Sequence, residues 1–191
     1  MRQTLKNSAL ACLFSLTHLP PCFAHDHTAR VGVLIGSYGD VDREDEIPDF
    51  VKRTLSDPDV VPLPRWFRSI ISEFGYRIRK QAIREEYREI GGRTNFRMTT
   101  SAQAEAVAES LREIGVDAKG YAGFTMTFPF VKEALGKAQA DGINQLIVFY
   151  QGAQYSRPTA YIVFRHVAEY LEQHPDCLLY TSDAADDTPC V

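Results

Sequence analysis

Apolar residues along this chain form two patterns, short apolar runs and longer stretches with a helical period. Short runs over 31–35 and 145–150 are rich in β-branched and aromatic residues, and the segment 117–124 has similar strand character. Runs of this length bounded by glycine or polar residues are typical of buried strands. The pattern therefore predicts three strands.

Apolar positions spaced three and four residues apart predict the helices. A short helix is expected over 47–55, and a longer one over 66–87 that stops at Gly91-Gly92. Thr100 to Gln103 has the form of a capping box, so the next helix is expected to open there and to end at Gly115. Further helices are expected over 131–140 and 162–171.

This alternation of strands and helices predicts an α/β fold. Strands joined by helices run parallel with right-handed crossovers, and the helices cover both faces. We expect a parallel three-layer sandwich of Rossmann-like form, with the 31–35 strand central. Ligands of such sheets bind beyond the carboxyl ends of the strands. That edge should carry three loops, over 36–40, 124–128 and 152–159.

The amino terminus reads as a secretory signal peptide over 1–24, with Arg2 and Lys6 before an apolar segment and a small-residue cleavage site at Ala24. A membrane anchor is the alternative, but the apolar segment is shorter than the ~20 residues that cross a bilayer. A lipid anchor on Cys22 is a second alternative. We expect a periplasmic or otherwise exported protein beginning at His25, with a cytoplasmic location as the alternative.

The carboxyl terminus, 177–191, has neither strand nor helix periodicity, and its first ten residues resemble the translation of a transposase-type sequencing adapter. We expect this tail to be non-native and to pack against nothing, so the natural sequence covers 25–176 of a truncated protein. All four cysteines then lie outside that range. Disulfides, thiolate catalysis, zinc-thiolate sites and iron–sulfur clusters are thereby excluded from it.

Charge argues against a nucleic-acid partner. The chain of 191 residues carries a formal net charge of −4, whereas phosphate contacts need a concentrated basic face. The basic residues of the 66–87 helix are interpreted as a solvated face rather than a binding patch.

The carboxyl-edge loops contain little that would bind phosphate. Gly32, Gly36 and Gly39 do not have the dinucleotide-binding spacing, and no Walker lysine follows. Aromatic and hydroxyl side chains prevail instead, which suits a flat apolar ligand, although an ordinary core rim is the alternative interpretation. His166 is expected to be structural rather than a ligand. No Ser-His-Asp triad or pair of catalytic carboxylates can be assigned.

Four motifs in order resemble the ferrochelatase family, whose members insert ferrous iron into a porphyrin. They are Ser37-Tyr38-Gly39, the helix end Tyr87 to Gly92 followed by Gln103, the loop from Gly123 to Phe130, and Gln154-Tyr155-Ser156 with Thr159. The similarity covers about 31–174. It implies the first of two similar domains, a lyase of haem and porphyrin biosynthesis, ferrous iron and a protoporphyrin or coproporphyrin as substrates, and no permanently bound cofactor.

The resemblance also implies a set of porphyrin-contacting residues, expected to border one cleft. Tyr38 would face the macrocycle near the metal, Arg53 and Tyr87 would reach the propionates, and the others would supply weaker contacts. The full set is Tyr38, Arg53, Tyr87, Thr94, Thr125, Met126, Tyr155 and Ser156. Peripheral membrane association and the oligomeric state stay open.

Three departures from the family pattern qualify this interpretation. Gly39-Asp40-Val41 stands where the family has Gly-Thr-Pro, Thr94-Asn95-Phe96 where it has Ser-Pro-Leu, and Thr125 where a basic residue is common. The family's metal-handling histidine and partner acid belong to its second half, so we expect this piece to be inactive and to bind no metal itself. An exported porphyrin or haem carrier is the second hypothesis, and a nucleotide-binding protein of similar fold is the third.

Overall fold

The computed structural model describes residues 29–152, 154–174 and 179–182, the last four by their backbone. The expected signal peptide and most of the expected tail lie outside the described residues. Four parallel strands form one sheet in the order β2-β1-β3-β4. Their bounds are β1 Arg30–Ser37, β2 Asp117–Phe124, β3 Gln145–Tyr150 and β4 Leu179–Ser182.

The three predicted strands are confirmed, with β1 between β2 and β3. The prediction that the 177–191 tail packs against nothing is wrong at β4, because Leu179 to Ser182 pair in register with Gln145 to Val148 of β3. The outer edge of β3 offers unpaired backbone N–H and C=O groups, and pairing with them needs no complementary side chains. Backbone hydrogen bonding explains how a segment without apolar periodicity can extend the sheet.

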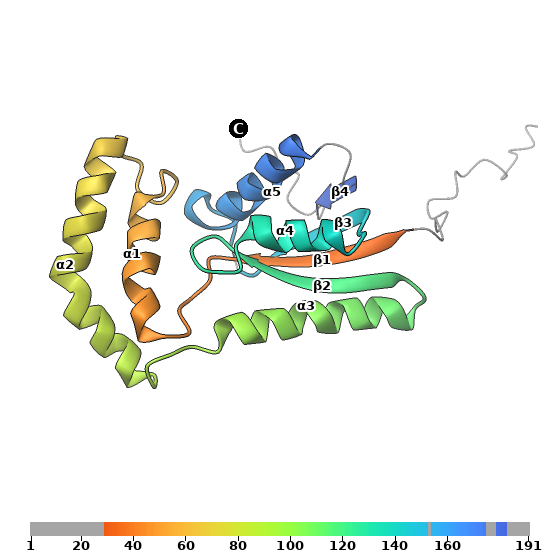
Figure 1. Ribbon diagram of the computed structural model, residues 1–191, viewed down its shortest axis with the longest axis horizontal. Helices are drawn as coiled ribbons and strands as arrows, with labels where there is room; N and C mark the ends of the chain where they lie inside the picture. The colour runs from red at the N-terminus through yellow and green to blue at the C-terminus, as the bar shows by residue number, and fades with distance from the viewer. Residues whose placement is uncertain (1–28, 153, 175–178, 183–191) are drawn as a thin grey trace, which may run out of the picture.

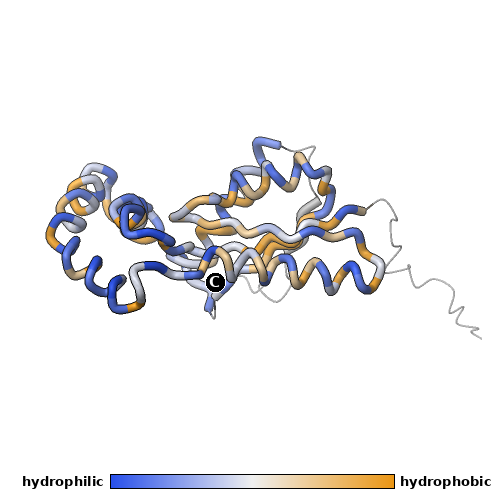
Figure 2. Tube along the Cα trace, turned by 60° about the horizontal axis from the view of Figure 1, so that its bottom comes forward, coloured by the Kyte–Doolittle hydropathy of each residue, from blue (hydrophilic) through white to orange (hydrophobic). Residues whose placement is uncertain are grey.

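Helices cover both faces of the sheet, as expected for this fold class. α3 (Phe96–Glu113) lies on one face, and α4 (Val131–Ala140) and α5 (Ile162–Gln173) lie on the other (Figure 1). Figure 2 shows the strands as the most continuously hydrophobic part of the chain. Alternate residues of β1 point to opposite faces of the sheet: Val33 packs with α3 on one face, and Leu34 packs with α4 and α5 on the other.

The capping-box prediction is wrong, because α3 begins four residues before Thr100. Thr100 is buried inside the helix, and its hydroxyl donates to Oε1 of Gln151 at 2.7 Å instead of capping a helix end. The Gly-Gly stop is confirmed: α2 ends at Glu89, and Gly91 and Gly92 both have positive φ angles. A short π-helix, Arg157–Tyr161, continues directly into α5 and occupies part of the expected loop.

Two antiparallel helices stand beyond the carboxyl ends of the strands. They are α1 (Ile47–Ser56) and α2 (Arg65–Glu89), and a 3₁₀ turn at Glu44–Glu46 leads into α1 (Figure 1). This hairpin therefore flanks the edge at which ligands of parallel sheets bind. Among the described residues, no helix has the length and apolar character to span a membrane.

Candidate functional site at the carboxyl edge of the sheet

The loops that follow β1 and β2 are joined by backbone hydrogen bonds. Thr125 N–H donates to Ser37 C=O and Met126 N–H donates to Tyr38 C=O, both at 3.0 Å. Gly39 sits between them with φ +86°, and a Cβ there would collide with the Thr127 side chain. Glycine is therefore required for the two loops to approach this closely.

Three successive residues of the β1 loop are each tied to a different part of the chain. The Tyr87 hydroxyl donates to Oδ1 of Asp40 at 2.5 Å. The C=O of buried Val41 accepts the N–H and hydroxyl of Thr94, at 3.3 and 3.2 Å. Asp42 accepts from Arg97 Nε at 2.7 Å. The loop that carries Tyr38 is thus held from α2, from the α2–α3 connection and from α3.

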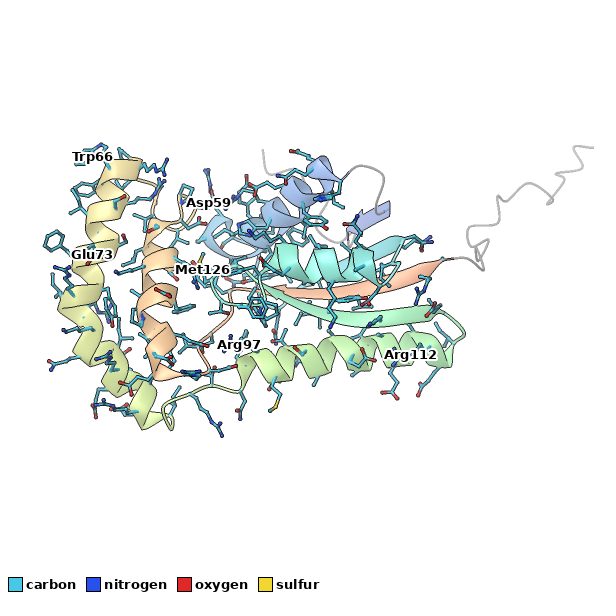
Figure 3. The ribbon with its side chains drawn as sticks, in the orientation of Figure 1. Asp59, Trp66, Glu73, Arg97, Arg112 and Met126 are labelled. Atoms are coloured by element: carbon cyan, nitrogen blue, oxygen red, sulfur yellow. The ribbon has the colours of Figure 1, made fainter. Side chains whose placement is uncertain are left out.

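Arg97 connects four segments, and sequence reasoning missed it. Besides Asp42, its guanidinium donates to both carboxylate oxygens of Glu46, at 3.0 and 2.9 Å, and to Phe128 C=O at 2.8 Å. Figure 3 places Arg97 at the start of α3, directed at the loop beneath α1. Its side chain is 17% exposed. The only signal in the sequence was its place just after the Gly-Gly stop.

Arg53 extends this network from α1. Its Nη1 donates to Met126 C=O at 3.0 Å, and the guanidinium carbon lies 5.1 Å from the centre of the Phe130 ring. Tyr38, Met126 and Arg53 are therefore linked through two consecutive hydrogen bonds to the backbone of Met126. The guanidinium keeps further N–H donors, since it has five in all.

Both tyrosines of this edge hold their protons tightly. Burial, followed by the negative charge of Asp57, raises the pKa of Tyr38 to about 12. Burial, followed by the hydrogen bond to Asp40, likewise raises the pKa of Tyr87. Each phenol is neutral at physiological pH. Because the one phenolic hydrogen of Tyr87 is given to Asp40, Tyr87 cannot donate to a propionate while that bond holds.

A cluster of ion pairs fixes the α1–α2 connection to the last helix. Asp59, with a side chain only 6% exposed, pairs with Arg157 Nε at 2.9 Å and with Arg165 Nε at 3.0 Å. Asp57 pairs with Arg165 Nη2 at 3.3 Å. Figure 3 shows Asp59 at the top of α1, facing the start of α5. The cluster holds the helical hairpin beside the segment that carries Tyr155 and Ser156.

The eight expected porphyrin contacts are only partly brought together. Five of them (Tyr38, Arg53, Tyr87, Thr94 and Met126) belong to the hydrogen-bonded network around the β1 loop. Thr125 joins that network by its backbone, but it lines a cavity of about 650 Å³ between α4 and α5. Tyr155 lines a smaller cavity of about 320 Å³ with Arg157 and Tyr161. The Ser156 hydroxyl lies 2.6 Å from that of Thr159.

His166 is half-buried and lines the larger cavity. Burial, followed by the charge of Arg165, lowers the pKa of its imidazole, so the ring is neutral at pH 7. Within the part of the chain that the structure describes, no three His, Cys, Asp or Glu side chains are grouped so as to hold a metal ion. His25 and His27 lie outside the described residues.

Comparison with known proteins gives a consistent family signal. The ferrochelatase family model matches residues 30–182. The chain is 33% identical over 147 residues to a ferrochelatase of Gloeothece citriformis and 31% identical over 149 residues to one of Thermosynechococcus vestitus. These matches cover 76% and 78% of the chain, but 38% of each relative. A chloroplastic ferrochelatase-2 of Oryza sativa subsp. indica is 34% identical over 134 residues, which cover 69% of the chain and 26% of the relative.

Proposed function

The chain belongs to the ferrochelatase family, and we propose that it forms the porphyrin-facing wall of an enzyme that inserts ferrous iron into a porphyrin. The observation that carries this proposal is the linkage of Tyr38, Met126 and Arg53 at the carboxyl edge of the sheet. Both hydrogen bonds use the backbone of Met126, so they fix the two loops to each other and hold the Arg53 guanidinium beside them. The half-buried phenol of Tyr38 and the Arg53 guanidinium suit a flat apolar macrocycle with carboxylate substituents.

The reaction itself defines what such a wall must do. Ferrous iron enters the macrocycle, the two pyrrole N–H bonds break, two protons leave, and iron–nitrogen bonds form without any change in oxidation state. The protein must hold the porphyrin, accept the two protons and deliver the iron. Tyr38 serves the first task by contact with the macrocycle, and Arg53 serves it through its remaining N–H donors. Met126, whose side chain is buried, positions both through its backbone.

Neither tyrosine of the network can accept a pyrrole proton at neutral pH. Tyr38 keeps its own proton up to a pKa of about 12, and Tyr87 holds its proton against Asp40. Tyr38 can therefore meet iron only through a neutral phenolic oxygen. We infer that this chain by itself binds porphyrin without metallating it, and that the proton acceptor and the metal-delivering residues come from the remaining length of the protein.

A second part of the proposal concerns the membrane, because porphyrins are poorly soluble in water. Five large apolar residues of α2 are exposed, and Trp66 and Ile78 are the most exposed, at 67% and 81%. The others are Phe67, Ile70 and Phe74. Seven arginines and lysines against four glutamates on the same helix favour an anionic lipid surface. We propose that α2 lies against such a surface beside the porphyrin site.

The experiment is a porphyrin titration of the chain followed by absorbance. Tyr38→Ala should weaken binding, and Tyr87→Phe should weaken it by releasing Asp40 and the loop. Tyr121→Phe is the matched control. Tyr121 is also a buried tyrosine whose hydroxyl donates to a carboxylate, that of Asp141 at 2.8 Å, but Asp141 precedes β3 and lies away from the carboxyl edge. Equal affinity in all three variants would overturn the proposal.

The competing hypothesis of an exported porphyrin carrier is separated by turnover. Both hypotheses expect binding by this chain, but only the enzyme expects a longer form of the protein to metallate porphyrin with ferrous iron. If the longer form binds porphyrin and shows no metallation, the carrier hypothesis replaces the enzyme.

A further inference from the structure

The cavity between α4 and α5 adjoins the network around Tyr38 at Thr125 and Phe130. It measures about 650 Å³, within the range of small-molecule sites. Its walls come from the loop after β2, the beginning of α4 and one face of α5. The lining residues are Thr125, Phe130, Lys132, Glu133, His166, Glu169, Tyr170, Gln173 and His174.

The floor of this cavity is aromatic. Phe130, His166, Tyr170 and His174 are half-buried, and Thr125 is only 6% exposed. Tyr170 and His174 stack with ring centres 4.2 Å apart and planes 15° from parallel, which gives α5 a flat surface. Such a floor complements a planar ring system.

The Thr125 hydroxyl and the His166 imidazole are the two polar groups of the floor that could form hydrogen bonds with a ligand. The Thr125 hydroxyl is buried and has no hydrogen-bond partner among the described residues. Because the hydroxyl oxygen is shielded where it stands, it would reach a ligand by the χ1 rotation that exchanges it with the methyl group. The neutral imidazole of His166 has one donor and one acceptor nitrogen. Hydroxyl and imidazole together match a ligand edge on which donors and acceptors alternate.

The rim of the cavity selects against anions. Its exposed charged residues are Glu133 and Glu169, with Lys132 as the single cation. Glu169 is paired with Arg165 Nη1 at 2.8 Å and Glu133 with Lys132 at 4.0 Å, so the lining cation is already engaged and offers little to a phosphate or a carboxylate. The remaining lone pairs of the two carboxylates can accept hydrogen bonds from an amino group.

We propose that the α4–α5 cavity binds a neutral, flat nitrogen heterocycle of the nucleobase type, with its ring against Phe130 and the Tyr170–His174 pair and its polar edge toward Thr125 and His166. The rim carboxylates then face an exocyclic amino group. This site adjoins the expected porphyrin contacts, since Thr125 belongs to both and the Phe130 ring lies 5.1 Å from the guanidinium carbon of Arg53.

Adenosine is the probe, titrated into the 191-residue chain and followed by ¹H–¹⁵N NMR. We expect saturable shifts at Thr125, Phe130 and Tyr170, and weaker binding of adenosine monophosphate because its phosphate meets the rim carboxylates. Thr125→Val should weaken adenosine binding about fivefold, the value of one hydrogen bond. It should not lower the melting temperature, because it removes an unpartnered hydroxyl.

Thr127→Val is the matched control. Thr127 is also buried with an unpartnered hydroxyl and lies two residues along the same loop, but it does not line the cavity. It should leave adenosine binding unchanged. The proposal is overturned if adenosine causes no saturable shifts at these residues, if the monophosphate binds more tightly, or if both threonine variants weaken binding equally.

Discussion

Replacing Arg97 by methionine tests whether the carboxyl-edge loops are held by the contacts described above. The substitution keeps an unbranched side chain and removes hydrogen bonds to Asp42, Glu46 and Phe128 C=O. Asp42 and Glu46 are 40% and 33% exposed, so water replaces part of what they lose. Hydrogen bonds to charged groups contribute roughly 1.5–3 kcal/mol each when buried, and much less when exposed. We expect a loss of about 2–3 kcal/mol for the whole set.

Urea denaturation measures this loss directly, and Arg112→Met is its control. Arg112 makes a similar pair of contacts, to Glu105 at 2.8 Å and to Ala118 C=O at 2.7 Å, but its side chain is 41% exposed. We expect that variant to lose no more than about 1 kcal/mol. Hydrogen exchange should in addition show faster exchange over 38–42 in Arg97→Met alone. Equal losses in the two variants, with unchanged exchange in that loop, would refute the reasoning.

Two further predictions follow from the fold and one from the sequence. Gly39→Ala should lower the melting temperature much more than Gly92→Ala. Both glycines have positive φ, but only at Gly39 would an added Cβ collide with the Thr127 side chain. Equal melting temperatures of the two variants would contradict this. Hydrogen bonds, the largest from Lys119, lower the pKa of the Asp141 carboxyl group. The carboxylate therefore stabilises the fold above the unfolded-state pKa of Asp, and this stabilisation is lost as the pH falls through the lowered pKa of the folded state. Asp141→Asn should accordingly lose stability at pH 7 and show a shallower decline in acid, which denaturation across pH would measure; a decline as steep as that of the parent would argue against it. Expression in a secreting bacterial host should yield a periplasmic protein whose amino-terminal sequence starts at His25, and an intact amino terminus in the cytoplasm would exclude the signal peptide.

Local patterns sufficed for much of the fold. The Val31 run is apolar and continuous because β1 is covered on both faces, and this made the central strand visible in the sequence. Gly91 and Gly92 adopt the positive φ angles that end α2, so their effect could be anticipated from residue type alone. The start of α3 could not be anticipated, because Thr100 pairs with a side chain 51 positions away rather than with its own helix.

The site was harder to predict for the same reason. Tyr87 and Asp40 are 47 positions apart, and Arg97 and Asp42 are 55 apart. Periodicity reports only which face of an element is buried, and it does not report which polar residues meet across loops. The family resemblance predicted Tyr38, Arg53 and Met126 as porphyrin contacts, whereas only the three-dimensional arrangement shows that Arg97 supports the loop that carries Tyr38.

The most direct test of the central claim is to map porphyrin binding onto the chain by ¹H–¹⁵N NMR. The account predicts saturable shifts at Tyr38, Arg53 and Met126 and little change at Lys119 and Asp141, which lie at the opposite edge of the sheet. Saturable shifts confined to that opposite edge, or none at the three predicted residues, would contradict the claim that the loops after β1 and β2 face the porphyrin.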